Sequence, residues 1–303
     1  MRVNEPNVMA VTAASAASRR QFLATGALLG VGAVGLSACG SARTADSSAT
    51  TSGGSAGAKF TVAQTQATLT DFLDQQGYRQ TAAAPLVTGS DYNGGLNFDE
   101  GLLRDGSAYV VQPSARVGDA KEKSKPGTLP VFTVLALSTP DSTQAPKTLD
   151  LFLQALTSVV GLDPSRLRVT TTSLAAPYYS ALASYGIQSD QIRLRSLPEA
   201  KESGTGSGYF APVGHPAGQA FPTFSVEYVL PDGTEIEIGE YGFNMVTSSS
   251  GTGFAVGLER VTMARNDQVT SWEDSLDAFK AAAKSDADKS GMPLPSGYNI
   301  IVG

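Results

Sequence analysis

The segment Phe221–Arg265 predicts two alternating strands joined by a tight turn, followed by a glycine-flanked strand that runs directly into a helix. In the first strand apolar residues alternate with other types, and the pattern resumes after the turn at residues 231–233. Because successive side chains of a strand point to opposite faces, one face of this hairpin is apolar and suited to burial. The apolar positions are Phe224, Val226, Tyr228, Leu230, Ile236 and Ile238.

The other face of the hairpin carries three carboxylates, those of Glu227, Glu235 and Glu237. Arg260 follows one helical turn after Gly257. Spacing alone leaves two interpretations open. A sheet with one solvated face carries acidic residues there without any further role. A buried arginine needs a charged partner, however, and for Arg260 this partner is either one of the glutamates or a ligand. The same residues are therefore also a candidate binding site.

The first 38 residues are predicted to be an export signal rather than part of the fold. Arg19 and Arg20 precede an apolar run rich in alanine and glycine, as in a twin-arginine signal. The run is too short and too glycine-rich for a stable membrane span. It ends in Leu-Ser-Ala-Cys, which resembles the lipobox of bacterial lipoproteins. We therefore expect twin-arginine export and a lipid anchor at Cys39 on the outer face of the cytoplasmic membrane.

Residues 39–58 have the composition of a flexible linker. Ser, Thr, Gly and Ala dominate this segment and cannot bury enough apolar surface to fold. The whole chain has a net charge of −6, and removal of residues 1–38 takes away three basic residues and one acidic residue, which leaves −8. A chain this acidic, without a basic cluster, is not expected to bind nucleic acid.

Residues 59–287 are predicted to form a single α+β domain in which helices flank a large antiparallel sheet. Thr61–Gln64 has the form of a capping box at the start of an amphipathic helix. Val131–Leu137 is a continuous apolar strand, and Lys147–Val160 gives a second helix. Antiparallel strands dominate after Phe210. The tail, residues 288–303, is expected to add a short strand through Tyr298, Ile300 and Val302.

The sequence carries no recognisable metal-binding or triad pattern. Cys39 is the only cysteine and His215 the only histidine, so neither a disulfide nor a zinc site is expected. His215 lies in the glycine-dense stretch 203–219, and no nucleophile motif accompanies it. This stretch has neither the phosphate-loop nor the dinucleotide pattern, and a surface loop explains it most simply.

One resemblance to a known family bears on the hairpin. Gly251–Arg260, which ends in Gly-Leu-Glu-Arg, resembles the third signature motif of class II aminoacyl-tRNA synthetases. Gln112–Asp119 resembles the family's second motif, and Glu237–Gly239 falls where alanyl enzymes have Glu-Ile-Trp-Asn. The resemblance runs from about Phe60 to Asn266 and is strongest to the catalytic core of alanyl-tRNA synthetase. It implies a class II synthetase-like fold.

The resemblance also implies roles for individual residues. Arg116 and Arg260 would hold phosphates, and Glu227 and Glu237 would lie near the adenine or the ammonium group of the amino acid. The chain departs from the alanyl enzymes at the His-His-Thr-Phe-Phe-Glu run of their second motif, because Val131–Leu137 lacks those histidines and that glutamate.

Two functions are consistent with these observations. The first is a non-catalytic, exported binding protein that takes a small zwitterion, such as an amino acid or short peptide, and needs no cofactor. Its candidate ligand contacts are Arg116, Glu227, Glu235, Glu237 and Arg260. Scarcity of ATP outside the cytoplasm favours this function. The alternative is an active adenylate-forming ligase, in which the two arginines stabilise the phosphate charge of ATP.

Overall fold

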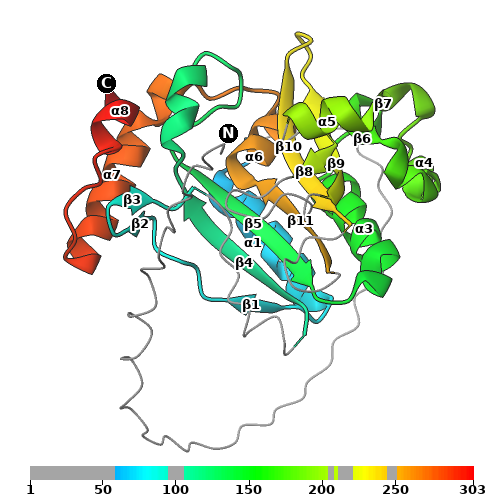
Figure 1. The fold of residues 1–303 in the computed structure, drawn as a ribbon, viewed down its shortest axis with the longest axis horizontal. Coiled ribbons are helices and arrows are strands. Elements are labelled where there is room, and N and C mark those ends of the chain that lie inside the picture. Colours follow the sequence, from blue (N-terminus) through cyan, green and yellow to red (C-terminus); the bar gives the residue numbers. More distant parts are fainter. Residues whose placement is uncertain (1–58, 95–105, 204–207, 211–220, 244–250) are drawn as a thin grey trace, which may run out of the picture. The chain divides into compact units, whose positions relative to one another are not determined.

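A nine-stranded sheet forms the centre of the computed structural model, which describes residues 59–94, 106–203, 208–210, 221–243 and 251–303 (Figure 1). These residues belong to one unit, Ala56–Gly303. The strands of the sheet are β1 (Arg79–Thr81), β4 (Ala108–Ser114), β5 (Phe132–Thr139), β6 (Leu167–Thr172), β7 (Ile192–Arg195), β8 (Tyr209–Phe210), β9 (Phe221–Val229), β10 (Glu235–Gly242) and β11 (Thr252–Gly257). Their order is β1-β4-β5-β11-β10-β9-β6-β7, and β8 pairs with β9.

The sheet is antiparallel from β4 through β6. Only its two outer pairs, β1 with β4 and β6 with β7, are parallel. The predicted α+β class with a large antiparallel sheet is therefore confirmed. Consecutive strands β9, β10 and β11 lie side by side at the centre, so the segment that the sequence singled out is also the middle of the sheet.

The β9–β10 hairpin closes at Gly233, which has a φ of 85° that a side chain would strain. Its register places Glu227 opposite Glu237 and Ser225 opposite Glu240, with an irregularity between Glu237 and Gly239. The irregularity is a β-bulge, which inserts one extra residue into one strand and shifts the alternation that follows. As a result, Glu237 and Glu240 lie on the same face although three positions separate them.

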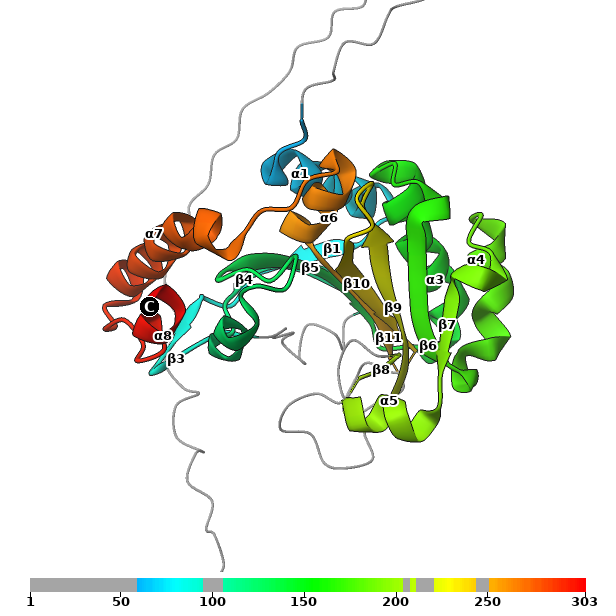
Figure 2. The same ribbon diagram turned by 90° about the horizontal axis from the view of Figure 1, so that it is seen from above.

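Three helices cover the apolar face of the sheet: α1 (Val62–Gln75), α3 (Ala145–Gln154) and α6 (Leu258–Asn266). Figure 2 shows them on the same side of the strands. Thr61 and Gln64 form the predicted capping box of α1. The core between the layers includes the stacked or tilted rings of Phe152, Tyr241 and Phe254, all buried. The predicted helix at 147–160 is present as α3 and the π-helix η3 (Ala155–Val159).

The remaining helical segments are short. The 3-10 helices are η1 (Val117–Glu122), η2 (Ser142–Gln144), η4 (Pro164–Arg166), η5 (Ser173–Tyr178) and η6 (Ser189–Gln191), and the short α-helices are α4 (Tyr179–Ser184) and α5 (Leu197–Ser203).

The C-terminal residues form a second, smaller apolar cluster beside the sheet. It consists of α7 (Trp272–Ser290), α8 (Tyr298–Val302) and the two-stranded β2–β3 sheet (Val87–Thr88 and Asp91–Tyr92). The prediction of a terminal strand through Tyr298, Ile300 and Val302 is wrong, because this segment is a helix whose Ile301 is buried. Residue 287, where we expected the domain to end, lies inside α7.

The export and lipidation predictions, at Arg19, Arg20 and Cys39, lie outside the described residues, as does His215. Among the residues that are described, no helix has both the length and the apolar character needed to cross a bilayer.

A substitution at Gly253 tests the strand register at the centre of the sheet. A Cβ at this position would overlap the carbonyl oxygen of Leu137 on β5. Gly253→Ala should therefore lower the free energy of unfolding by about 2 kcal/mol or more, because neighbouring strands on both sides prevent relaxation. Gly118→Ala is the matched control, since no atom lies within 4 Å of its added Cβ. Urea unfolding measures both, and an equal effect of the two substitutions would contradict the register.

Candidate functional site

Arg260 stands in the first turn of α6, where β11 passes directly into the helix. Its Nε donates a hydrogen bond to the carbonyl oxygen of Gly127, at 2.8 Å. Its Nη1 lies 3.9 Å from Oε2 of Glu237 on β10. The side chain of Arg260 is 21% exposed and that of Glu237 is 36% exposed. The structure thus brings together two of the residues that the sequence singled out.

Arg116 lies in the same region, although it is far from Arg260 in the sequence. It precedes η1, and its Nε donates to the carbonyl oxygen of Gly94 at 2.7 Å. Its guanidinium carbon lies 5.2 Å from the ring centroid of Phe132, and that of Arg260 lies 5.9 Å from the same centroid. Both cations therefore interact with the π-system of one ring. Phe132, the first residue of β5, links the two predicted arginines.

Glu227 lies directly across the hairpin from Glu237. Its Oε1 accepts a hydrogen bond from the hydroxyl of Thr170 on β6, at 3.2 Å. Burial raises the pKa of Glu227 to about 7, and the neighbouring carboxylates of Glu237 and Glu235 add to the increase, while the Thr170 hydrogen bond opposes it. Near neutral pH, this carboxyl group is therefore divided between its acidic and its ionised form.

Glu235 pairs with Arg193 on the neighbouring part of the sheet. Its two carboxylate oxygens accept hydrogen bonds from Nη1 and Nη2 of Arg193 on β7, at 2.7 and 2.5 Å. This bidentate pairing lowers the pKa of Glu235. Glu235 therefore stays near Glu227, but its charge is already matched by Arg193, which is not one of the predicted contact residues.

Asp119 is a member of the cluster that we did not predict. It lies in η1, and burial raises its pKa, while the positive charges of Arg116 and Arg260 lower it. Asp119 is the last residue of Gln112–Asp119, the segment that resembles the second motif. Its closeness to Arg116 in the sequence could therefore have identified it as a site residue. Phe132 gave no such signal, because an aromatic residue at the start of an apolar strand is usually a core residue.

We call the group formed by Arg116, Asp119, Glu227, Phe132, Glu237 and Arg260 the mixed-charge cluster. It combines two guanidinium groups, three carboxyl groups and one aromatic ring. Such a set can bind a carboxylate or phosphate through the arginines and an ammonium group through the acids. Within the described part of the chain, no group of three or more His, Cys, Asp or Glu residues could hold a metal ion.

The polar face of the sheet continues from the cluster along β9 and β10. Oε1 of Glu240 accepts hydrogen bonds from the hydroxyls of Thr223 at 2.6 Å and Ser225 at 3.1 Å. Thr223 and Ser225 are themselves buried. Glu240 was not predicted as a site residue, because the bulge that brings it to this face cannot be read from strict alternation.

Solved structures to which this chain is similar include class II aminoacyl-tRNA synthetases. S. aureus histidyl-tRNA synthetase matches with 14% identity over 67% of this chain and 65% of its own, at a TM-score of 0.41. Entamoeba histolytica asparaginyl-tRNA synthetase matches with 12% identity over 72% of this chain and 65% of its own, at 0.43. Desulfitobacterium hafniense pyrrolysyl-tRNA synthetase matches with 13% identity over 69% of this chain and 70% of its own, at 0.40.

These values are low, and we assign neither a family nor an activity from them. No protein-family model matches the sequence, and no curated protein matches it. The α+β fold is established here by the strand order and pairing of the sheet itself. Similarity to the alanyl enzyme in particular stays a prediction.

The raised pKa of Glu227 predicts a specific dependence of stability on pH. Its folded-state pKa of about 7 exceeds the ordinary value of 4.5, so the folded protein holds the proton more tightly. The contribution of Glu227 to the free energy of unfolding therefore declines as the pH rises from about 4.5 to about 7. Glu227→Gln should be about 1–3 kcal/mol more stable than wild type at pH 8 and gain little at pH 4.5.

Urea unfolding at about pH 3.5, 4.5, 6 and 8 measures this difference. Glu235→Gln is the matched control, because Arg193 lowers the pKa of Glu235 and the sign is reversed. That variant should lose stability at neutral pH, and the loss should shrink as the pH falls below the ordinary value of 4.5. A Glu227→Gln difference that does not change with pH would contradict the assigned pKa.

Proposed function

We propose that this chain is a lipid-anchored extracytoplasmic protein whose mixed-charge cluster binds a small zwitterion, such as an amino acid or a short peptide, without catalysing a reaction. The arginines would hold the ligand's carboxylate, and Glu227 with Glu237 would hold its ammonium group. Export and lipidation rest on the predictions at Arg19, Arg20 and Cys39.

The observation that carries this proposal is the open geometry of the Arg260–Glu237 pair. Two other pairs in the same structure are closed, Arg193–Glu235 at 2.5 Å and Arg166–Asp267 at 2.7 Å. Arg260 and Glu237 instead stand 3.9 Å apart, beyond hydrogen-bonding distance. The Lys125–Glu122 pair also stands 3.9 Å apart, but it is far more exposed than Arg260 and Glu237. At the less exposed pair, the open spacing leaves a donor and an acceptor available to a ligand.

The electrostatic state of Glu227 supports the same proposal. A carboxyl group with a pKa of about 7 is costly to ionise in the empty site. An ammonium group placed between Glu227 and Glu237 would lower that pKa, because an opposite charge favours the ionised form. Ligand binding would thus relieve the unfavourable juxtaposition of two carboxylates across the hairpin.

A second candidate function is the adenylate-forming ligase. Its support is the meeting of Arg116 and Arg260 at the Phe132 ring, where two cations could hold a polyphosphate. Amino-acid-dependent exchange of pyrophosphate into ATP by the purified protein decides between the two. Exchange that Arg260→Ala abolishes would replace the binding proposal with this one, and its absence for all amino acids would exclude the ligase.

Arg260 is the residue whose loss should weaken zwitterion binding most. Isothermal titration with a panel of amino acids and short peptides should find a ligand whose affinity falls on the order of 10- to 100-fold in Arg260→Gln, because a charge-assisted hydrogen bond is lost. Arg265→Gln, on the same helix, is the matched control, because its guanidinium contacts the carbonyl of Gly161 and the ring of Phe60 and no residue of the mixed-charge cluster among those described. Equal affinity in wild type and Arg260→Gln would refute the proposal.

The lipid anchor predicts a separate outcome for Cys39. In the expressing bacterium, wild-type protein should partition into the detergent phase of Triton X-114, whereas Cys39→Ala should move to the aqueous phase. The reason is that the acyl chains supply most of the membrane affinity. Detergent partitioning that is unchanged in Cys39→Ala would rule out this anchor.

A further inference from the structure

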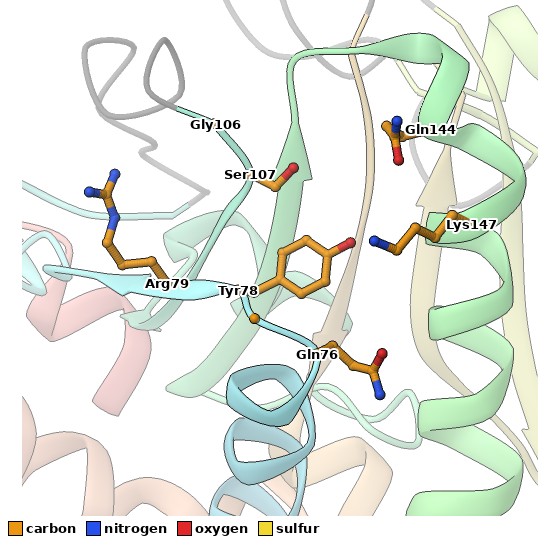
Figure 3. A pocket seen from close by; sticks show the side chains of 8 residues that line it. Gln76, Tyr78, Arg79, Gly106, Ser107, Gln144 and Lys147 are labelled. Carbon is orange, nitrogen blue, oxygen red and sulfur yellow. The ribbon is translucent and has the colours of Figure 1, made fainter.

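Two surface features outside the mixed-charge cluster are candidates for binding a partner. One is the cavity between the end of α1 and the start of α3, whose lining includes Tyr78, Arg79 and Lys147. Figure 3 shows the Arg79 side chain directed away from Tyr78 and Lys147, so these two cations do not converge on one ligand. The other feature is an exposed apolar surface on the segment that follows α7.

Residues 291–303 carry three of the five large hydrophobic side chains that are exposed among the described residues. They are Met292 and Leu294, each 41% exposed, and Ile300, which is 60% exposed. The other two, Leu174 and Leu194, lie apart from them in η5 and β7. Single exposed apolar residues are ordinary on a protein surface, but a group of them in one short segment indicates a contact surface. We call Met292, Leu294 and Ile300 the C-terminal apolar surface.

The inner side of the same segment packs against α7. At the start of α7, the Nε1 of Trp272 donates a hydrogen bond to the carbonyl oxygen of Ile301 at 3.3 Å. Two helical turns further along, the ring of Phe279 stacks on that of Tyr298, with the centroids 5.6 Å apart. The segment therefore runs back along α7 with these residues turned inward, and the C-terminal apolar surface stays exposed to solvent.

The small size of this surface argues against a second copy of the chain as its occupant. A stable protein–protein interface takes about 800 Å² from each partner. Three side chains, two of them less than half exposed, supply only a small part of such an area. A bilayer sets no such minimum for a protein that is already tethered to it, because the tether makes docking an intramolecular step with a high effective concentration.

The predicted linker enters the domain at the end of α6, from which the chain continues into α7. The backbone of Phe60 exchanges two hydrogen bonds with the side chain of Asn266, at 2.9 and 2.8 Å. Asn266 precedes Trp272, the first residue of α7, which contacts α8. The nineteen residues 40–58 span at most about 65 Å. A bilayer that holds Cys39 is therefore within reach of the C-terminal apolar surface.

Apolar contact, rather than charge, favours the bilayer as the occupant. On α7, Lys280 pairs with Asp277 at 3.2 Å and Lys284 pairs with Asp288 at 2.8 Å. These ion pairs match the positive charges that would otherwise attract anionic lipid, and the chain as a whole has a net charge of −6. Insertion of apolar side chains at the boundary between headgroups and acyl chains needs no such charge.

We propose that the C-terminal apolar surface docks on the bilayer that carries the lipid anchor, with Met292, Leu294 and Ile300 inserted at the headgroup boundary. This inference rests on the anchor proposed at Cys39 and does not depend on the zwitterion site. Docking by three side chains is weak alone, and the tether makes it persistent. Because α8 packs against η1, docking also sets how the mixed-charge cluster is turned relative to the membrane.

Quenching of a fluorophore by spin-labelled lipid tests this docking. The full chain is purified from bacterial membranes, labelled with nitrobenzoxadiazole at Ser296→Cys, and reconstituted into phosphatidylcholine vesicles with nitroxide-labelled headgroups. Ser296 is exposed and lies between Leu294 and Ile300, and acylation blocks the sulfur of Cys39, the only other cysteine. The comparison label is Ser184→Cys, at the end of α4.

The two label positions lie on opposite sides of the domain. Figures 1 and 2 both show α7 and α8 at one edge of the sheet and α4 with β7 at the other. The nitroxide should quench the label at residue 296 about 3-fold more strongly than the label at residue 184, because only a docked segment brings a label to the depth of the headgroups.

Substitutions on the apolar surface should abolish this difference. Ile300→Ser combined with Met292→Ser should reduce quenching at residue 296 to the level at residue 184. Leu194→Ser is the matched control, because it removes a similarly exposed apolar side chain from β7, and it should leave the quenching unchanged. Replacing half of the phosphatidylcholine with phosphatidylglycerol should also leave it unchanged. The fluorescence of Trp272, the only tryptophan, confirms that each variant is folded.

Flotation of the vesicles separates failure of the anchor from failure of the docking. A chain that does not float with the vesicles would overturn the anchor and this inference together. A chain that floats but is quenched equally at the two positions would overturn this inference alone. Quenching that survives the double substitution, or that requires phosphatidylglycerol, would also overturn it, because the apolar surface would then not carry the contact.

Discussion

Cross-strand pairing between β9 and β10 is the interaction on which the rest of the structure depends. Its register buries Phe224, Tyr228 and Ile236 against the helices, and the same register sets Glu227 opposite Glu237 on the other face. A slip of one residue would exchange the two faces and bury carboxylates in the apolar core. Core packing and the charges of the site are therefore specified by one set of backbone hydrogen bonds.

The charges on the polar face differ in how completely they are matched. Glu235 is held by a bidentate arginine, and Glu240 by two hydroxyls, so both are satisfied within the fold. Glu227 and Glu237 face each other, and the nearby Arg260 stays 3.9 Å from Glu237. Stabilising interactions surround the cluster, whereas inside it the Arg260–Glu237 pair stays open and Glu227 faces a second carboxylate.

Local patterns in the sequence predicted a large part of the fold. The alternation of β9 and β10 and the capping box of α1 are local signals, and the structure confirms them. The meeting of Arg116 with Arg260 at Phe132 depends on strand order, which no local pattern encodes. The bulge near Gly239 and the cavity at Lys147 likewise arise from pairing and packing between distant segments. The prediction of a terminal strand was wrong because the alternation overlooked a second apolar set, Tyr298, Ile301 and Val302, which has helical spacing and is the set that the structure turns inward.

The position of α8 has a consequence for the loop that carries Arg116. Gly297, just before α8, lies so close to Val117 that a Cβ there would overlap its side chain, and Ala115 and Ile301 share one apolar cluster. The residues on either side of Arg116 are thus packed against residues about 180 positions later in the chain. Substitutions at the far carboxyl end can therefore shift the backbone that carries Arg116 while leaving every residue of the mixed-charge cluster unchanged.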